Sequence, residues 1–337
     1  MSAHENRTEV FRSPIADPAA WDAASIGGKA GVTHALNAAE LSAIAAILER
    51  TRNRPTYELT KSDFDVPELQ RCFGSIWREI LHGTGVVLVS GVTPEAFDPA
   101  DFERIFWGFG LQFGTPAVQS AAKNRIGHVR LEKENPRNRG YMSDRELGFH
   151  SDAFEVIGLM CVQNAPSGGF THIVSSLAVH NELLKHHPHV LDALYEGYPY
   201  ATAERTVSSR PVTPYSVPVF SRVGETVSSM CVDTYMRMAA DKLGVTFPPA
   251  LDEALQRFFE TCARRDLILE FLMDPGEILL LNNFTTVHSR TKFEDSETQR
   301  RHLLRLWLKV ADGRPVVPAL LARGTDYEEL CQQNQRG

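Results

Sequence analysis

The chain has 337 residues, of which 43% are hydrophobic and 23% are charged, values that are ordinary for a globular protein. This length can bury a large core and allows one domain or two. The formal net charge of -7 argues against a general nucleic-acid-binding protein, which needs a basic face. It does not exclude an anionic small-molecule substrate, because a few local arginines can outweigh a mild overall charge.

The cysteines and the lengths of the apolar runs indicate where in the cell the protein is located. Five cysteines are scattered along the chain without a Cys-x-x-Cys pair, which favours free thiols in a reducing compartment over a disulfide framework. The first residues form no apolar signal-peptide core, and no apolar run approaches the roughly 20 residues of a membrane helix. We therefore expect a cytoplasmic protein that binds neither membranes nor nucleic acid.

The N-terminal third reads as an arm followed by amphipathic helices. Residues 1–36 are polar and rich in small residues, and they predict a loose N-terminal arm. Apolar residues recur at helical spacing over 38–53, 67–82 and 99–110, with Asn37 a candidate cap for the first helix. Residues 86–89 form a short apolar run that is typical of a buried strand.

A polar stretch follows. Residues 111–147 are rich in Gly, Asn and charged residues, and 132–143 contain both a proline and a glycine. Two interpretations fit this segment equally well: a mobile loop that covers a site, or a solvated connector.

The second half mixes short strands, turns and helices. Strands are expected at 158–162, 171–176, 278–281 and 301–310, and helices at 177–185 and 249–266, with a weaker helix at 326–332 in the tail. Histidines 186, 187 and 189 end one helix with no carboxylate or cysteine at ligand spacing, so we expect a surface cluster. Strands with turn signals, framed by helices, suit a mainly β fold with α additions: a distorted double-stranded β-helix (jelly roll) core flanked by helices.

The candidate chemistry centres on two histidines and an aspartate. His150 and Asp152 are two residues apart, so on an extended segment both side chains point to the same face. His288 follows the apolar run 278–281 and would come from another strand. Two imidazoles and one carboxylate suit a facial triad on non-haem Fe(II), with the remaining coordination positions open. The His-x-Asp pair alone would fit a hydrogen-bonded surface histidine as well.

A hydroxyl and two guanidinium groups accompany this set. Thr171 follows His150 by 21 residues, and Arg301 follows His288 by 13. Together they offer what a buried dicarboxylate needs, since arginine gives a charged, bidentate fork and threonine a neutral donor. If a strand begins at Arg301, its alternation places Arg305 on the same face.

These motifs carry a family resemblance. They are Phe149 to Asp152, Gly168 to Thr171, Asn282 to Arg290, and Arg300 to Arg305. In this order and spacing the chain resembles the taurine dioxygenase / clavaminate synthase-like superfamily of Fe(II)- and 2-oxoglutarate-dependent oxygenases. The resemblance covers roughly residues 80–310. It implies a single oxygenase domain over 37–312, with an insert at about 198–270 between the halves of the barrel and a C-terminal tail at 313–337.

The resemblance also implies roles for the site residues. His150, Asp152 and His288 would bind Fe(II), and 2-oxoglutarate would chelate the iron through its keto oxygen and adjacent carboxylate. Arg301 and Thr171 would hold the far carboxylate of this co-substrate. Arg305 has two interpretations: an anchor for an acidic group of the substrate, or a second arm on 2-oxoglutarate. O2 would be consumed, and succinate and CO2 released.

The same resemblance limits the reaction. Related halogenases have a small residue where this chain has Asp152, so we expect hydroxylation rather than halogenation, while desaturation, cyclisation and oxidative cleavage use the same oxidant. The expected substrate is a small molecule, such as an amino acid or a natural-product intermediate. The alternative within the family is degradation of a sulfonate or a carboxylate, and a homo-oligomer is compatible with the resemblance.

Two further hypotheses lie outside the family. A zinc hydrolase could use the same two imidazoles and carboxylate, but it would leave Arg301 and Thr171 without a function. A cupin-like metal-binding protein without oxygenase activity would be expected to have lost a ligand, and this chain has all three.

Overall fold

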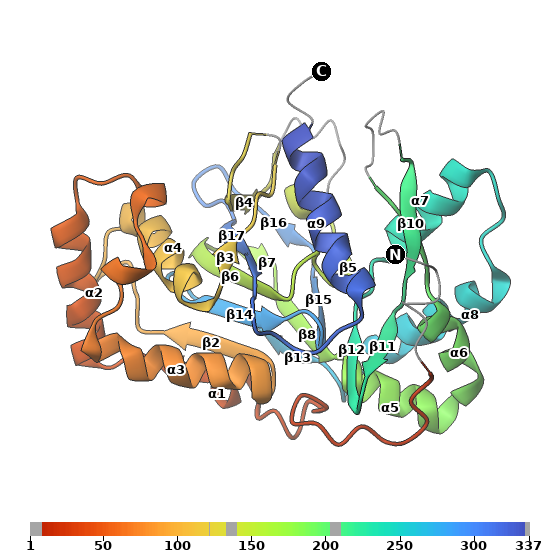
Figure 1. The fold of residues 1–337 in the computed structure, drawn as a ribbon. Coiled ribbons are helices and arrows are strands. Elements are labelled where there is room, and N and C mark those ends of the chain that lie inside the picture. The colour runs from red at the N-terminus through yellow and green to blue at the C-terminus, as the bar shows by residue number, and fades with distance from the viewer. Residues whose placement is uncertain (1–8, 121, 133–139, 203–209, 334–337) are drawn as a thin grey trace.

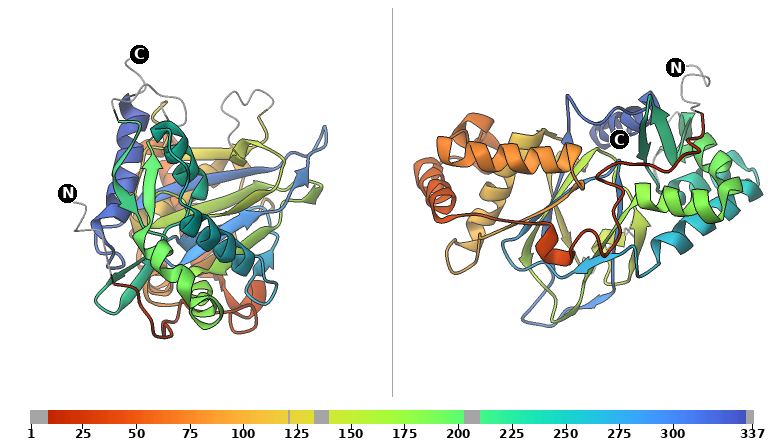
Figure 2. Two further views of the ribbon diagram at one scale, coloured as in Figure 1. Left: turned by 90° about the vertical axis from the view of Figure 1, so that its right-hand side faces the viewer. Right: turned by 90° about the horizontal axis from the view of Figure 1, so that it is seen from below.

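A computed structural model of the protein describes residues 9–120, 122–132, 140–202 and 210–333. Two β-sheets form its centre, and helices flank them on either side (Figures 1 and 2). The major sheet has the strand order β1-β2-β14-β6-β17-β3, with β4 also paired to β17, and the minor sheet has the order β13-β8-β15-β5. The expected mainly β core with helical additions is therefore confirmed.

The strand bounds follow the expected apolar runs closely. The major sheet consists of β1 (Thr33–Ala35), β2 (Val86–Ser90), β3 (Thr115–Pro116), β4 (Ile126–Arg130), β6 (Val156–Gln163), β14 (Ile278–Asn282) and β17 (His302–Lys309). The minor sheet consists of β5 (Leu147–His150), β8 (Thr171–Ser175), β13 (Leu269–Phe271) and β15 (Thr286–Arg290). Three two-stranded pairs complete the β structure: β7 (Ser167–Gly168) with β16 (Phe293–Glu294), β9 (Tyr198–Ala201) with β10 (Val212–Val217), and β11 (Phe220–Val223) with β12 (Thr226–Ser229).

Strand alternation divides the major sheet into two faces. Along β17, Leu304, Leu306 and Leu308 pack into the cluster beneath the N-terminal helices, whereas Leu303 and Trp307 pack into the cluster between the two sheets. Because side chains alternate along a strand, Arg305 shares the inner face with Leu303 and Trp307. The inner face therefore carries both core residues and charged groups.

Helices cover the outer face of the major sheet. They are α2 (Ala38–Thr51), α3 (Pro67–His82) and α4 (Phe102–Phe113). Asn37 caps α2 as expected, since its side chain accepts hydrogen bonds from Ala39 and Glu40 while the Glu40 carboxylate accepts from the Asn37 backbone. The buried aromatic residues Phe106 and Phe109 of α4 pack in the same cluster as the outer side chains of β6 and β14.

A second helical group covers the outer face of the minor sheet. It contains α5 (Ser176–His186), α6 (Leu191–Glu196) and α8 (Pro249–Cys262), and it packs on Val174 of β8 and Val287 of β15. Figure 2 shows the sheets between the two helical groups when the molecule is seen from below. Helix α7 (Asp233–Leu243) follows β12 and packs on β9. No helix in the described ranges is long and apolar enough to cross a membrane.

Both ends of the chain differ from the expected loose segments. Within residues 9–36, Trp21 and Ile26 are buried in the core between the sheets, a short helix α1 (Gly28–Gly31) forms, and β1 pairs in parallel with β2 at the edge of the major sheet. At the other end, α9 (Pro318–Gln333) is twice as long as the helix expected from the sequence, and Leu320 is fully buried. The amphipathic signal is weak in both segments, because their partners are distant in sequence.

Candidate active site

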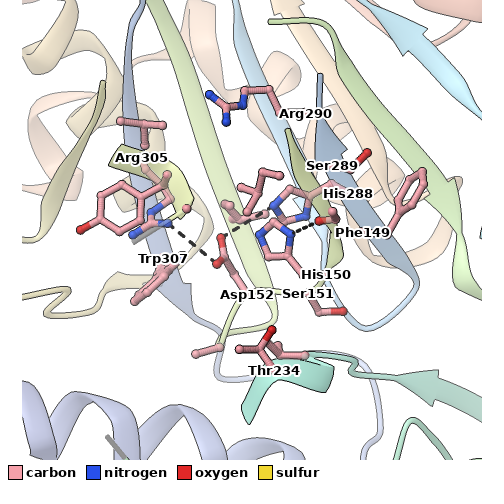
Figure 3. A pocket seen from close by; sticks show the side chains of 18 of the residues that line it. Phe149, His150, Ser151, Asp152, Thr234, His288, Ser289, Arg290, Arg305 and Trp307 are labelled. Carbon is pink, nitrogen blue, oxygen red and sulfur yellow. Dashed lines mark hydrogen bonds and ion pairs between the residues drawn. The ribbon is translucent and has the colours of Figure 1, made fainter. Parts of the chain in front are cut away.

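The three expected metal ligands meet between the sheets. His150 and His288 are direct partners on the antiparallel strands β5 and β15, and their ring centroids lie 4.4 Å apart. Asp152 follows just after the end of β5, and its Oδ2 lies 4.0 Å from Nε2 of His288. Figure 3 shows the three side chains directed toward a common point. The structure thus brings together residues that the sequence could only place on separate strands.

Neighbouring groups fix these ligands in place. The carbonyl oxygen of Gly148 lies 2.9 Å from Nδ1 of His150, which holds the proton on that nitrogen and leaves Nε2 as the free ligand atom. Asn283, in the turn between β14 and β15, accepts a hydrogen bond from the backbone of Asp152 and donates one to the carbonyl of Phe154. Asn283 therefore couples the segment that carries Asp152 to the turn that precedes His288.

The charges in this group favour a metal. Burial by itself would raise the pKa of Asp152, but the positive charge of Arg305, followed by the proximity of His288 and His150, lowers it below its ordinary value. Burial, with the nearby His150, lowers the pKa of His288 to about 3, so this imidazole is neutral and can act as a ligand. Among the described residues, Oδ2 of Asp152 has no hydrogen-bond partner although it is buried. A cation between these groups would satisfy that oxygen, and the donor set fits Fe(II).

A second cationic group lies beside this one. Arg301 is buried, and its Nε and Nη1 atoms have no hydrogen-bond partner within the described part of the chain. Arg290 lies nearby: the guanidinium carbons of Arg290 and Arg301 are 4.6 Å and 5.3 Å from the ring centroid of Phe293. Thr171 is paired in register with Arg290 and lines the same cavity.

Burial disfavours the charged forms of Arg290 and Arg301. Burial lowers the pKa of Arg301 to about 10, and the proximity of Arg290 contributes to this shift. Burial likewise lowers the pKa of Arg290 to about 10, although its terminal nitrogens donate to the carbonyls of Ser143 and Arg145. Unpaired guanidinium nitrogens in a buried position are costly unless an anion meets them. Arg301 and Thr171, the two residues predicted to hold a carboxylate, thus line one cavity, and Arg290 is an additional positive charge there that the sequence did not single out.

Arg305 lies at the end of the cavity that holds the metal ligands. Its Nη1 is 3.9 Å from Oδ1 of Asp152, and its Nε donates a 2.9 Å hydrogen bond to Oε1 of Gln119. The guanidinium carbon lies 4.2 Å from the ring centroid of Trp307 and 4.8 Å from that of Tyr141 (Figure 3). Gln119 also donates to the backbone carbonyl of Arg305, so it holds both parts of that residue.

One cavity of about 440 Å³ includes all of these groups. Its wall also contains residues that the sequence did not identify: Tyr141, Tyr200, Asp233, Thr234, Arg323 and Tyr327. In the described part of the polar stretch 132–147, Tyr141 and Leu147 line the cavity, whereas no residue of 210–227 in the insert does. Residues 133–139 and 203–209 lie outside the described residues.

The strands of the insert that lie outside the cavity wall do so for a physical reason. Strands β10, β11 and β12 bury their side chains in the cluster beneath the minor sheet, so they face away from the cavity. In the described part of the insert, the chain reaches the cavity at Tyr200 of β9 and again where β12 has ended and α7 begins, between Met230 and Tyr235. Sequence composition gave no sign of this turn, because its orientation depends on the packing of α7 against β9.

The histidine cluster of α5 is no metal centre among the described residues. Nε2 of His186 lies 3.7 Å from Glu182, and Nε2 of His189 lies 3.4 Å from Glu253. Glu182 is also paired with Arg264. His186 and His189 therefore belong to a partly exposed network of ion pairs, and His187 contacts the ring of His189.

Comparisons with known proteins agree with this geometry. The model of the family "Taurine catabolism dioxygenase TauD, TfdA family" matches residues 51–307. The chain is 26% identical to FR-33289 synthase of Streptomyces rubellomurinus over 320 residues, which cover 91% of this chain and 93% of the relative.

Solved structures share the fold at low identity. An asparagine oxygenase in complex with Fe(II), 3-hydroxyasparagine and succinate superposes with a TM-score of 0.63 at 16% identity, covering 82% of this chain and 93% of the other. The non-haem iron oxygenase OrfP in complex with Fe and alpha-ketoglutaric acid gives a TM-score of 0.58 at 15% identity, covering 82% and 94%. The family match, which spans most of the chain, confirms the expected enzyme class and its cofactors. The chain belongs to the TauD, TfdA family of dioxygenases, which depend on Fe(II) and 2-oxoglutarate.

Proposed function

We propose that His150, Asp152 and His288 bind the Fe(II) of this dioxygenase, and that the enzyme hydroxylates a small anionic molecule. The observation that carries the proposal is one cavity that contains both the His-Asp-His set and buried arginines with unpaired nitrogens. The metal set alone would also suit hydrolysis by zinc. The arginines have a function only if a dicarboxylate binds beside the metal.

Different residues of this cavity bind the two carboxylates of the co-substrate. Arg301 and Thr171 hold the far carboxylate of 2-oxoglutarate, and Arg290 adds positive charge at that end. Arg305, whose Nη1 lies 3.9 Å from Oδ1 of Asp152, would bind the other carboxylate of 2-oxoglutarate beside the metal ligands. This assignment favours the second of the two interpretations of Arg305, an arm on the co-substrate rather than an anchor for the substrate.

The bound metal and co-substrate supply the oxidising chemistry: one C–H bond, O2 and 2-oxoglutarate give one C–OH group, succinate and CO2. The chain's own residues orient the reactants and keep bulk water away. Trp307, Tyr141 and Leu303 form apolar walls beside the charged groups, which strengthens every electrostatic contact inside the cavity.

The size of the cavity supports a small substrate. A volume of about 440 Å³ lies in the lower part of the range for small-molecule sites, and 2-oxoglutarate would take a share of it. Two structural neighbours contain hydroxylated amino acids, 3-hydroxyasparagine and (3S)-hydroxy-L-Arg. An amino acid or a natural-product intermediate of similar size is the substrate class that we propose, and the sulfonate or carboxylate alternative uses the same anionic chemistry.

The buried, unpaired thiols of Cys72, Cys161, Cys231 and Cys262 support a reducing, cytoplasmic location.

The proposal is tested by anaerobic reconstitution of the full chain with Fe(II) and 2-oxoglutarate. We expect the weak visible charge-transfer band of an iron-bound keto acid, and we expect succinate release when small anionic candidates are added with O2. Iron that binds without producing the band would contradict the proposed co-substrate site.

A further inference from the structure

The C-terminal helix α9 lies directly against the segment that carries Asp152. A Cβ atom on Gly324 would lie 2.8 Å from the carbonyl oxygen of Ala153 and 3.0 Å from the ring of Phe154. Only glycine allows so close an approach. Arg323, the preceding residue, therefore enters the same cavity as the metal ligands.

Several contacts fix α9 in this position. The hydroxyl of Tyr215 donates a 2.5 Å hydrogen bond to Asp326. Glu328 accepts from the backbone of Val118 and forms a 2.8 Å ion pair with Lys309 at the end of β17. The helix is thus attached both to the insert and to the major sheet. Figure 1 shows it crossing the molecule between these two parts.

Arg323 occupies an aromatic cage. Its guanidinium carbon lies 5.5 Å, 4.9 Å and 5.4 Å from the ring centroids of Tyr200, Tyr235 and Tyr327. The residue is only 4% exposed. Tyr327 in turn packs edge-on against Trp307, whose ring contacts Arg305. The cage is therefore continuous with the wall beside the metal ligands.

What Arg323 lacks is a counter-ion. No ion pair or hydrogen bond joins its side chain to any residue in the described part of the chain. The buried Arg314, by contrast, pairs with Asp17 at 2.7 Å, and Asp233 of the cavity wall is paired with Arg237 at 3.2 Å. Three aromatic faces stabilise a guanidinium only in part, and a buried charge without an anion is costly. The cavity is the direction from which an anion can reach this group.

We propose that Arg323 binds an oxyanion of the substrate, such as a carboxylate, sulfonate or phosphonate, and that α9 determines substrate specificity in this way. This inference rests on the proposed function, because it assumes that Arg301 and Arg305 are engaged by the co-substrate. Arg323 lines the cavity with its guanidinium among three tyrosine rings, and a planar guanidinium suits two oxygens of one group. The family match ends at residue 307, before α9 begins, so this contact lies outside the segment that the family model covers.

The stability of Arg323→Met distinguishes binding from a structural role. If the charge serves only the fold, its loss lowers the melting temperature. If the charge awaits a ligand, its removal leaves the melting temperature unchanged or raises it, because relief of a buried charge without a counter-ion offsets the loss of the contacts with the three tyrosine rings. Arg300→Met, at an exposed neighbour of Arg301, removes the same charge without touching the cavity and serves as the control.

The binding experiment uses the full chain loaded with Fe(II) and 2-oxoglutarate under anaerobic conditions. Butanoate, propanesulfonate and propylphosphonate are titrated calorimetrically, with neutral butanamide as the reference probe. We expect at least one oxyanion to bind, butanamide not to bind, and Arg323→Met to weaken that binding about tenfold or more. Arg323→Lys, which keeps the charge but loses the fork, is expected to bind with intermediate affinity, and it replaces the methionine variant if the latter does not fold.

Each outcome separates the two proposals. If the charge-transfer band forms but no oxyanion binds, or Arg323→Met binds as tightly as the parent, the inference about Arg323 is wrong and the proposed function stands. If the band does not form although iron is bound, the proposed function itself fails. If the band forms and an oxyanion binds, the probe that binds most tightly identifies the acidic group of the substrate.

Discussion

His288 lies directly opposite His150 across the pairing of β15 with β5, and this register brings the two imidazoles to one point. Replacing His288 by alanine removes one of the three proposed metal ligands and leaves the other two. We expect Fe(II) affinity to fall at least about 100-fold, because loss of an outer-shell partner alone costs 10–100-fold. Metal content after dialysis and the charge-transfer band measure the effect.

His172→Ala provides the matched control for His288. His172 lies on the adjacent strand β8, pairs with Glu270 at 2.6 Å, and does not line the cavity. The His172→Ala variant should therefore bind iron as tightly as the parent protein. Equal loss of iron in the two variants would show that the imidazole at position 288 has no special role.

Arg301→Met tests the site for the far carboxylate of 2-oxoglutarate. The variant loses a charged, bidentate partner of the co-substrate, a contact of about 1.5–3 kcal/mol, so KM for 2-oxoglutarate should rise by about tenfold to 100-fold. Its melting temperature should hold or increase, since buried nitrogens of Arg301 lack partners among the described residues. A less stable protein with unchanged KM would instead assign Arg301 to the fold. The exposed Arg300→Met is the control.

The buried carboxyl group of Glu155 gives a pH-dependent prediction. Burial raises the pKa of Glu155 to about 7, although the backbone and charge of Arg314 partly oppose the shift. The unfolded chain ionises at lower pH, so the folded state binds the extra proton and loses stability as pH rises from about 4.5 to 7. At 1.36 kcal/mol for each pH unit, this loss is at most about 3 kcal/mol.

Glu155→Gln should remove that dependence. Its amide oxygen can still accept the hydrogen bond from the Arg314 backbone, so the variant should gain stability relative to the parent protein as pH rises through this window. Urea denaturation at pH 5, 6, 7 and 8 measures the difference, with the exposed Glu297→Gln as control. A difference between Glu155→Gln and the parent that does not change with pH would contradict the prediction.

Alanine substitutions at two helical glycines should change the stability of the protein in opposite directions. A Cβ on Gly108 in α4 would lie 2.1 Å from the ring of Phe64, which is fully buried, so Gly108→Ala should destabilise the protein by about 1–3 kcal/mol. Gly74 in α3 is exposed, and a methyl group added there would meet nothing within 4 Å. Gly74→Ala should therefore stabilise by about 0.5–1 kcal/mol. Thermal unfolding of both variants measures the contrast, and a shift in the same direction would contradict it.

The sequence by itself determined the features that depend on local periodicity and spacing. The helical spacing of apolar residues predicted α2 and α3, with Asn37 as cap. Strand alternation predicted that Arg305 shares a face with Arg301, and the spacing of His150 and Asp152 predicted that both side chains reach one site. These signals survive in the sequence because neighbouring residues on one element meet the same environment.

Only the tertiary structure decided which distant segments meet. The pairing of β5 with β15, the burial of residues near Trp21, and the placement of α9 beside Ala153 all depend on packing between parts of the chain that carry no mutual signal in one sequence. Arg323 is the clearest case. In the sequence it is one arginine in a weakly amphipathic tail, and it becomes a cavity residue only because three tyrosines from separate elements close around it.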